Sequence, residues 1–207
     1  DKYIENYCQT LRNLAQAGID CVCYNFMPVF DWTRSDLNFE LPDGSHALIY
    51  REETVHDMNP LTGDLALPGW DASYTKDGMK ALLTKYQSIT EEDLWNNLKY
   101  FLDRVIKVAE EVKIKMAIHP DDPPWSIFGL PRIITNKANL ERFLKLYDSK
   151  YNGLTLCSGS LGVDPNNDIV DLVKSFADRI HFAHIRNIKI TGEKCFEEAA
   201  HKTECGS

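Results

Sequence analysis

Strand-like and helix-like segments alternate along this chain, and no other feature of the sequence limits the possible folds as strongly. Short apolar runs typical of buried strands cover residues 19–26, 114–119, 153–157 and 179–187. Apolar residues at helical spacing cover residues 3–17, 90–112, 136–147 and 168–177. Parallel strands need long crossover connections, which are usually helices, so the alternation predicts a parallel β-sheet covered by helices.

The spacing of the strands favours one kind of parallel sheet. The last three strands recur at intervals of roughly 30–40 residues, the length of a βα unit. An open doubly wound sheet often carries a glycine-rich phosphate-binding turn near its first strand, and the sequence has no such turn there. We therefore predict an α/β fold of the TIM (β/α)8 barrel type, with residues 1–207 forming a single, partial barrel domain.

A long stretch between the first strand and the second helix has no clear periodicity. Residues 27–90 include PDGS, NPLTG and LPGW, which are typical of turns. We expect this region to be a loop or lid insertion that carries function or forms a small subdomain. The sequence also lacks a starting Met and opens inside a helical pattern, so we expect it to be part of a longer protein.

Charge and composition exclude several classes of partner. The net charge of -8 disfavours nonspecific binding to nucleic acid, which depends on basic surface, whereas a small anionic substrate would need local arginines. The absence of any apolar run of about 18 residues predicts that no helix spans a membrane. Six cysteines are sparse for this length. Because Cys8, Cys21 and Cys23 fall in apolar segments, we expect reduced core thiols and a cytoplasmic protein.

Three successive predicted strands end in a side chain that can bind a metal ion: His119, Cys157 and His184. In a barrel, side chains at the carboxyl ends of the strands converge on one site. Two imidazoles and a thiolate suit a divalent ion such as iron, manganese, cobalt or zinc. Each residue taken singly is more often an ordinary core residue, but their equivalent positions favour a metal site. His181 has the opposite parity to His184, so we expect it to face away.

The loops after the strands contain residues that could bind a substrate. Asn25 follows the first strand, and Trp32 and Arg34 could cover a pocket and grip a carboxylate. Ser158 offers a hydroxyl after the third strand, and Arg186 follows His184 where a substrate anion could lie. The alternatives are an ordinary loop with one packed aromatic ring and one solvated charge, and a plain glycine turn at residues 158–162.

Four segments closely resemble the mannonate dehydratase family: YNFMPVFDWTRSDL, MAIHPDDPPWSIFGLPRI, NGLTLCSGSLG and HFAHIRNIK. The resemblance implies a xylose-isomerase-like TIM barrel. It also implies a hydro-lyase of hexuronate catabolism that converts D-mannonate to 2-dehydro-3-deoxy-D-gluconate with Fe²⁺ or Mn²⁺. The metal-binding His, Cys and His of the family match His119, Cys157 and His184. The resemblance is also compatible with a homo-oligomer.

One departure from the family pattern affects the site. The family has a later Arg-Pro-Asp-His-Gly segment that supplies a further Asp ligand and catalytic groups, and this sequence contains no such segment. The resemblance therefore assigns no catalytic acid or base here. Two other functions remain open: a metal-dependent sugar isomerase or epimerase on the same barrel, and a noncatalytic sugar-acid binder or scaffold fragment. Metal analysis of reduced protein would separate the enzymes from the binder, which needs no redox-sensitive Cys157.

Overall fold

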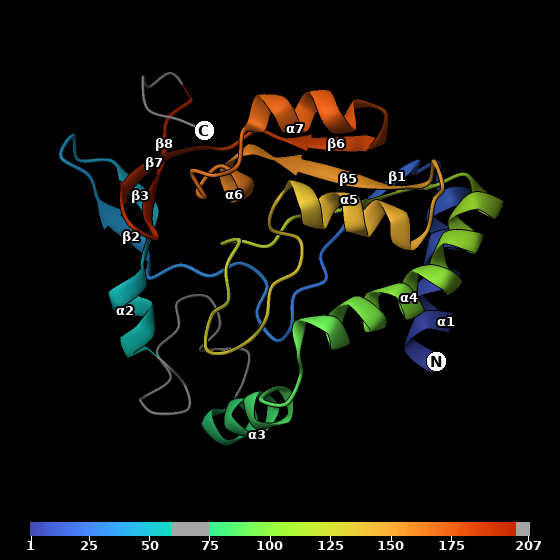
Figure 1. Cartoon of the computed structure of the whole chain (residues 1–207), viewed down its shortest axis with the longest axis horizontal. Coiled ribbons are helices and arrows are strands. Elements are labelled where there is room, and N and C mark those ends of the chain that lie inside the picture. Colours follow the sequence, from blue (N-terminus) through green and yellow to red (C-terminus); the bar gives the residue numbers. More distant parts are fainter. Residues whose placement is uncertain (59–74, 202–207) are drawn as a thin grey trace.

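The computed structural model describes residues 1–58 and 75–201, which form two four-stranded sheets and the helices around them (Figure 1). One sheet is parallel, with strands β1 (Cys21–Tyr24), β4 (Lys115–Ile118), β5 (Asn152–Cys157) and β6 (Ile180–His184). The other is antiparallel, with strands β2 (Asp36–Glu40), β3 (His46–Arg51), β7 (Asn187–Gly192) and β8 (Cys195–Ala199). The helices are α1 (Lys2–Gln16), α2 (Glu52–Asp57), α3 (Lys76–Tyr86), α4 (Glu91–Val112), α5 (Lys137–Leu146), α6 (Ser158–Leu161) and α7 (Ile169–Phe176), with a 3₁₀ turn η1 at Ala177–Arg179.

The parallel sheet has the strand order β1-β4-β5-β6, which is the chain order of its strands. Each strand pairs in parallel with the next, so all four carboxyl ends lie at the same edge of the sheet. Cys157 at the end of β5 lies opposite His184 at the end of β6. This sequential parallel arrangement confirms the prediction of a partial TIM barrel.

Helix α4 shows how the local sequence determines where a helix begins and which of its faces packs against the parallel sheet. Its N-terminus is a capping box, because the Thr90 hydroxyl accepts the Asp93 N–H at 3.1 Å while the Asp93 carboxylate accepts the Thr90 N–H at 2.9 Å. Its apolar face carries Leu98 and Leu102, which are fully buried in the same core as Met116 of β4. The apolar residues of α4 recur every three to four positions, so they form one face of the helix, and this face packs against the sheet as predicted.

The antiparallel sheet was not predicted. Within residues 27–90, which we expected to be a loop or lid insertion that carries function or forms a small subdomain, the structure contains β2, β3, α2 and α3; residues 59–74 of that range lie outside the described part. The run 179–187, expected to be one strand, is divided: β6 ends at His184 and β7 begins at Asn187 in the other sheet. The β2–β3 turn uses Gly44 at a φ of 82°, a conformation that glycine adopts without strain.

The antiparallel sheet lies beside the carboxyl-terminal edge of the parallel sheet (Figure 1). A separate apolar cluster holds it there, in which Tyr50 of β3 stacks on Phe196 of β8 with ring centroids 5.5 Å apart. Trp125 packs edge-on against Tyr50 and donates its indole N–H to the Tyr50 hydroxyl at 3.2 Å. The sheet therefore brings polar residues of β8 and of the segment before β2 to the strand ends. Within the described ranges, no helix is both long and apolar enough to cross a membrane.

Candidate functional site

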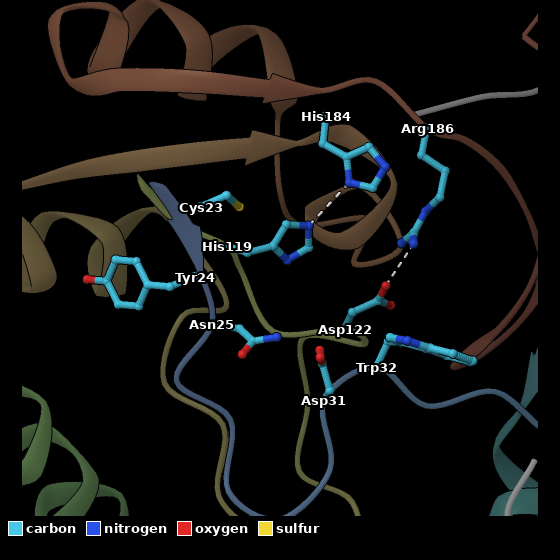
Figure 2. A pocket seen from close by; sticks show the side chains of 9 residues that line it. All are labelled: Cys23, Tyr24, Asn25, Asp31, Trp32, His119, Asp122, His184 and Arg186. Carbon is cyan, nitrogen blue, oxygen red and sulfur yellow. Dashed lines mark hydrogen bonds and ion pairs between the residues drawn. The ribbon is translucent and has the colours of Figure 1, made fainter. Parts of the chain in front are cut away.

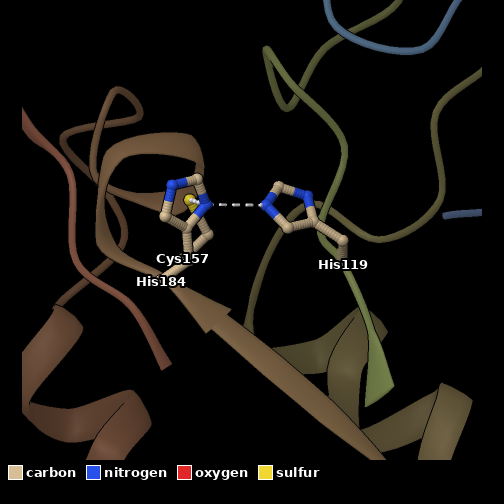
Figure 3. Close-up of side chains that lie close together, drawn as sticks. All are labelled: His119, Cys157 and His184. Carbon is tan, nitrogen blue, oxygen red and sulfur yellow. Dashed lines mark hydrogen bonds between the residues drawn. The ribbon is translucent and has the colours of Figure 1, made fainter. Parts of the chain in front are cut away.

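Three side chains with metal-binding atoms converge at the carboxyl ends of the parallel strands (Figure 3). His119 directly follows β4, Cys157 ends β5 and His184 ends β6. The His119 Nε2 lies 3.3 Å from the His184 Nδ1, which lies 3.4 Å from the Cys157 Sγ. All three ligand atoms lie within 4.8 Å of one another. Among the residues that the structure describes, this is the group of three or more His, Cys, Asp or Glu side chains that lie close enough together to hold a metal ion.

Hydrogen bonds orient the His119 ring toward this group. Its Nδ1 lies 2.7 Å from the Pro120 carbonyl, which can only accept, so Nδ1 carries the proton and the lone pair of Nε2 faces His184. Burial lowers the pKa of His119, and burial together with the charges of His119 and Arg186 lowers the pKa of His184. Both effects favour neutral imidazole, the form that binds metals. A backbone carbonyl holding the second nitrogen is also the usual support of a metal-binding histidine.

The third member of the group, Cys157, is fully buried between its neighbours. Burial raises the pKa of its thiol, while Arg186 and a hydrogen bond from the Ser160 hydroxyl at 3.1 Å act in the opposite direction. A thiolate with a hydrogen-bond donor and a nearby cation is a suitable metal ligand. Two nitrogens and one sulfur therefore fit a borderline divalent ion, and these three residues could hold one.

A pocket with a volume of about 350 Å³ opens beside this group (Figure 2). This volume falls within the range of about 300–1,000 Å³ that is usual for small-ligand sites. Its lining comes from the ends of β1, β4 and β6 and the loops that follow them, and comprises Cys23, Tyr24, Asn25, Asp31, Trp32, His119, Asp122, His184 and Arg186. The structure thus places the expected site residues Asn25, Trp32 and Arg186 around one cavity with two of the candidate metal ligands.

A network of buried and partly buried charges forms one wall of the pocket. Asp122 accepts two hydrogen bonds from Arg34, at 2.9 and 3.1 Å, and pairs with Arg186 at 2.8 Å. Glu198 of β8 pairs with Arg34 at 3.0 Å and lies 3.7 Å from Arg186. Burial alone would raise the pKa of Asp122, but Arg34 and Arg186 hold that pKa well below its ordinary range. Two cations therefore face two anions at this wall.

The structure corrects the expected position of Arg34. Its side chain is only 1% exposed and does not line the pocket. The planar guanidinium does grip a carboxylate with two hydrogen bonds, as expected of arginine, but that carboxylate belongs to Asp122. Arg34 therefore lies behind the pocket wall and holds Asp122 in place.

Ser158 also lies behind the wall rather than in the lining. Its hydroxyl donates to the Arg186 carbonyl at 2.8 Å and accepts the Arg186 N–H at 3.1 Å. This pair of hydrogen bonds fixes the backbone from which the Arg186 side chain reaches into the pocket. His181, by contrast, has its Nδ1 3.0 Å from the Met116 carbonyl and is not part of the metal-binding group.

Sequence reasoning did not single out Asp31, Asp122 or Glu198 as site residues. A signal existed for Asp122, because it follows a strand-end histidine by three positions within the segment HPDDPP. Asp31 stood directly beside the predicted Trp32. Glu198 carried no signal, because its strand belongs to a sheet that the sequence did not indicate.

Gly159 leaves room for the Arg186 side chain, and we expect Gly159→Ala to disturb it. An added methyl group would lie 2.8 Å from the Arg186 Cβ and 3.0 Å from its Cγ, inside contact distance. We expect the free energy of unfolding, measured with urea, to fall by about 1–3 kcal/mol, as is usual for overpacking. Gly192→Ala is the control, because its methyl group would meet Cys195 at an ordinary 3.6 Å. Equal stability of the two variants would contradict the prediction.

Comparisons with known proteins identify the family of this chain. The family model described as D-mannonate dehydratase (UxuA) matches residues 1–207. This chain belongs to the mannonate dehydratase family. It is 63% identical over 209 residues to mannonate dehydratase 2 of Halalkalibacterium halodurans, covering all of this chain and 61% of that protein. It is 58% identical over 209 residues to mannonate dehydratase of Streptococcus agalactiae serotype V, covering all of this chain and 60% of that protein.

A solved structure of the same family supports the fold. The crystal structure of mannonate dehydratase from Streptococcus suis serotype 2 superposes with a TM-score of 0.87 at 48% sequence identity, covering all of this chain and 56% of that one. The chain thus spans about 60% of the length of the curated relatives that it matches. Over this region, the chain therefore has the same fold as that mannonate dehydratase.

Proposed function

We propose that the full-length protein dehydrates D-mannonate to 2-dehydro-3-deoxy-D-gluconate, using Fe²⁺ or Mn²⁺ held by His119, Cys157 and His184. The observation that carries the proposal is the convergence of these three side chains on one pocket in a chain of the mannonate dehydratase family. The pocket is small and its lining includes polar and charged side chains, which suits a six-carbon sugar acid. A bound divalent ion would supply Lewis-acid stabilisation of the negative charge that develops on the substrate oxygens.

The reaction removes a proton from C2 and a hydroxyl group from C3, and water leaves overall. The negative charge that develops beside the C1 carboxylate must be stabilised while the C2–H bond breaks. Arg186 is placed to assist, because its guanidinium lines the pocket next to His184. Asp122 and Glu198 balance the charges of Arg34 and Arg186, so Arg186 would hold a bound anion by hydrogen bonds from its guanidinium rather than by a net positive charge of the wall.

The other lining residues would position the sugar acid. Trp32 offers a flat apolar surface, and Asn25 offers an amide that can donate to and accept from hydroxyl groups. Arg34 and Ser158 would act indirectly, by holding Asp122 and the backbone of Arg186. We therefore propose Asn25, Trp32 and Arg186 as substrate contacts.

The test is a reaction of metal-reconstituted, full-length protein with D-mannonate under anaerobic conditions. We expect a product that has lost one molecule of water and reacts as a 2-keto acid, formed only after Fe²⁺ or Mn²⁺ is added. Mass spectrometry separates this result from isomerisation or epimerisation, whose products keep the mass of mannonate. A product of unchanged mass would favour the isomerase, and binding without any product would favour the noncatalytic sugar-acid binder.

A further inference from the structure

Asp31 points a carboxylate into the pocket beside the metal-binding group (Figure 2). The other carboxylate of the lining, Asp122, is paired with both Arg34 and Arg186. The side chain of Asp31, in contrast, makes no hydrogen bond or ion pair with the residues that the structure describes. Its charge acts on the nearby His119 and Arg132. Because a half-buried carboxylate that accepts no hydrogen bond from the described residues keeps its acceptor capacity, Asp31 can accept one from a ligand.

The backbone around Asp31 is held firmly, so this carboxylate has a defined position. Phe30 is fully buried, and the buried Arg132 donates to the Asp31 carbonyl at 3.1 Å. The next residue but one, Thr33, donates its N–H to the Asp122 carbonyl at 3.1 Å. Arg132 thus contacts the main chain of Asp31 and leaves its carboxylate facing the cavity. A group held in this way can bind a ligand without first being ordered.

The charge of Asp31 indicates which end of a sugar acid it can face. A carboxylate repels the carboxylate of a substrate but accepts strong hydrogen bonds from hydroxyl groups. Arg186 provides the cationic side of the same pocket, and a divalent ion held by the His119–Cys157–His184 group would add to it. The acidic end of the substrate therefore belongs with Arg186, and its hydroxyl groups belong with Asp31.

We propose that Asp31 is a specificity-determining residue that accepts a hydrogen bond from one of the C4, C5 or C6 hydroxyl groups of the bound sugar acid. This proposal rests on the proposed function, because it takes the substrate class from it. The proposal adds two points to that function: the orientation of the substrate in the pocket, and a residue that recognises one of its hydroxyl groups by a hydrogen bond. Asp31 would distinguish a polyhydroxylated acid from a deoxy or shorter acid with the same reacting carbons.

The test compares D-mannonate with three analogues that each lack one hydroxyl group, on C4, C5 or C6. In metal-loaded, full-length wild-type protein, we expect one analogue to bind and react about 10- to 150-fold less well, the usual effect of a lost hydrogen bond to a charged group. In Asp31→Ala, mannonate and that analogue should become nearly equal. The loss of discrimination, measured as kcat/KM and by calorimetry, is the coupling between residue and hydroxyl group.

Two further measurements separate this role from others. Asp31→Asn should nearly keep the thermal stability of the wild type, because the Asp31 carboxylate makes no hydrogen bond or ion pair with the described residues; Asp178→Asn, on the exposed turn η1, is the control for charge removal. If Asp31→Ala lowers kcat equally for all four acids, Asp31 serves chemistry or stability and the proposal is overturned. If wild-type protein binds mannonate without dehydrating it, the proposed function fails while calorimetry still tests Asp31. If it binds none of the acids, both fail.

Discussion

Replacing Cys157 with serine is expected to remove most of the divalent metal from the full-length protein. Cys157 supplies the sulfur of the metal-binding group, and its Sγ lies 3.4 Å from the His184 Nδ1. A serine hydroxyl is far less acidic than a thiol and is a poor ligand for a borderline ion. Loss of a supporting residue near a metal costs about 10- to 100-fold in affinity, so loss of a direct ligand should cost at least about 100-fold.

The measurement is metal content after dialysis, together with affinity from chelator competition under anaerobic conditions. Cys8→Ser is the matched control, because Cys8 is also a buried free thiol but lies in α1, away from the strand ends. We expect that control to keep its metal while losing some stability from the core. Unchanged metal affinity in Cys157→Ser would remove Cys157 from the ligand set and contradict the proposed three-residue site.

Asp122→Asn is expected to destabilise the protein by about 3–5 kcal/mol, the usual cost of removing one partner from a buried ion pair. Asp122 is buried and accepts hydrogen bonds from Arg34 while it pairs with Arg186. An asparagine would leave the buried guanidinium of Arg34 and the partly buried one of Arg186 with Glu198 as the remaining anion of the network. Urea unfolding at neutral pH measures the loss.

The control for Asp122 is an exposed ion pair. Asp148 pairs with Arg179 at 3.0 Å, but its side chain is 90% exposed. Exposed ion pairs contribute little because water and salt screen them, so Asp148→Asn should leave the unfolding free energy nearly unchanged. An equally small effect of Asp122→Asn would mean that the buried network does not stabilise the fold.

The contribution of Asp122 should also depend on pH in a defined direction. Its pKa in the folded protein lies well below the ordinary value of about 3.9, because Arg34 and Arg186 outweigh the effect of burial. The unfolded state therefore binds more protons in acid, and the stabilisation is complete above about pH 5 and declines as the pH falls toward the folded pKa. The difference between wild type and Asp122→Asn should shrink from pH 7 to pH 3. A constant difference would contradict the lowered pKa.

Local patterns in the sequence determined the parallel sheet of this protein and the helices that cover it. The alternation of helices and strands requires only the periodicity of neighbouring residues, and the capping residues Thr90 and Asn136 act within three positions. Because parallel strands all end at the same edge, the strand positions alone indicated that His119, Cys157 and His184 could meet. Here a local signal was sufficient because the topology is regular.

Only the tertiary structure decided the chemistry of the pocket wall. Arg34 meets Asp122 across 88 residues of chain and Glu198 across 164, and no local pattern encodes such pairs. Their meeting depends on the antiparallel sheet, in which β3 pairs with β8 from the far end of the chain. Whether an arginine faces a ligand or is buried behind it depends on which charges surround it after folding. The sequence by itself therefore determined which side chains reach the strand ends, whereas packing between distant segments determined which of them remain available to a substrate.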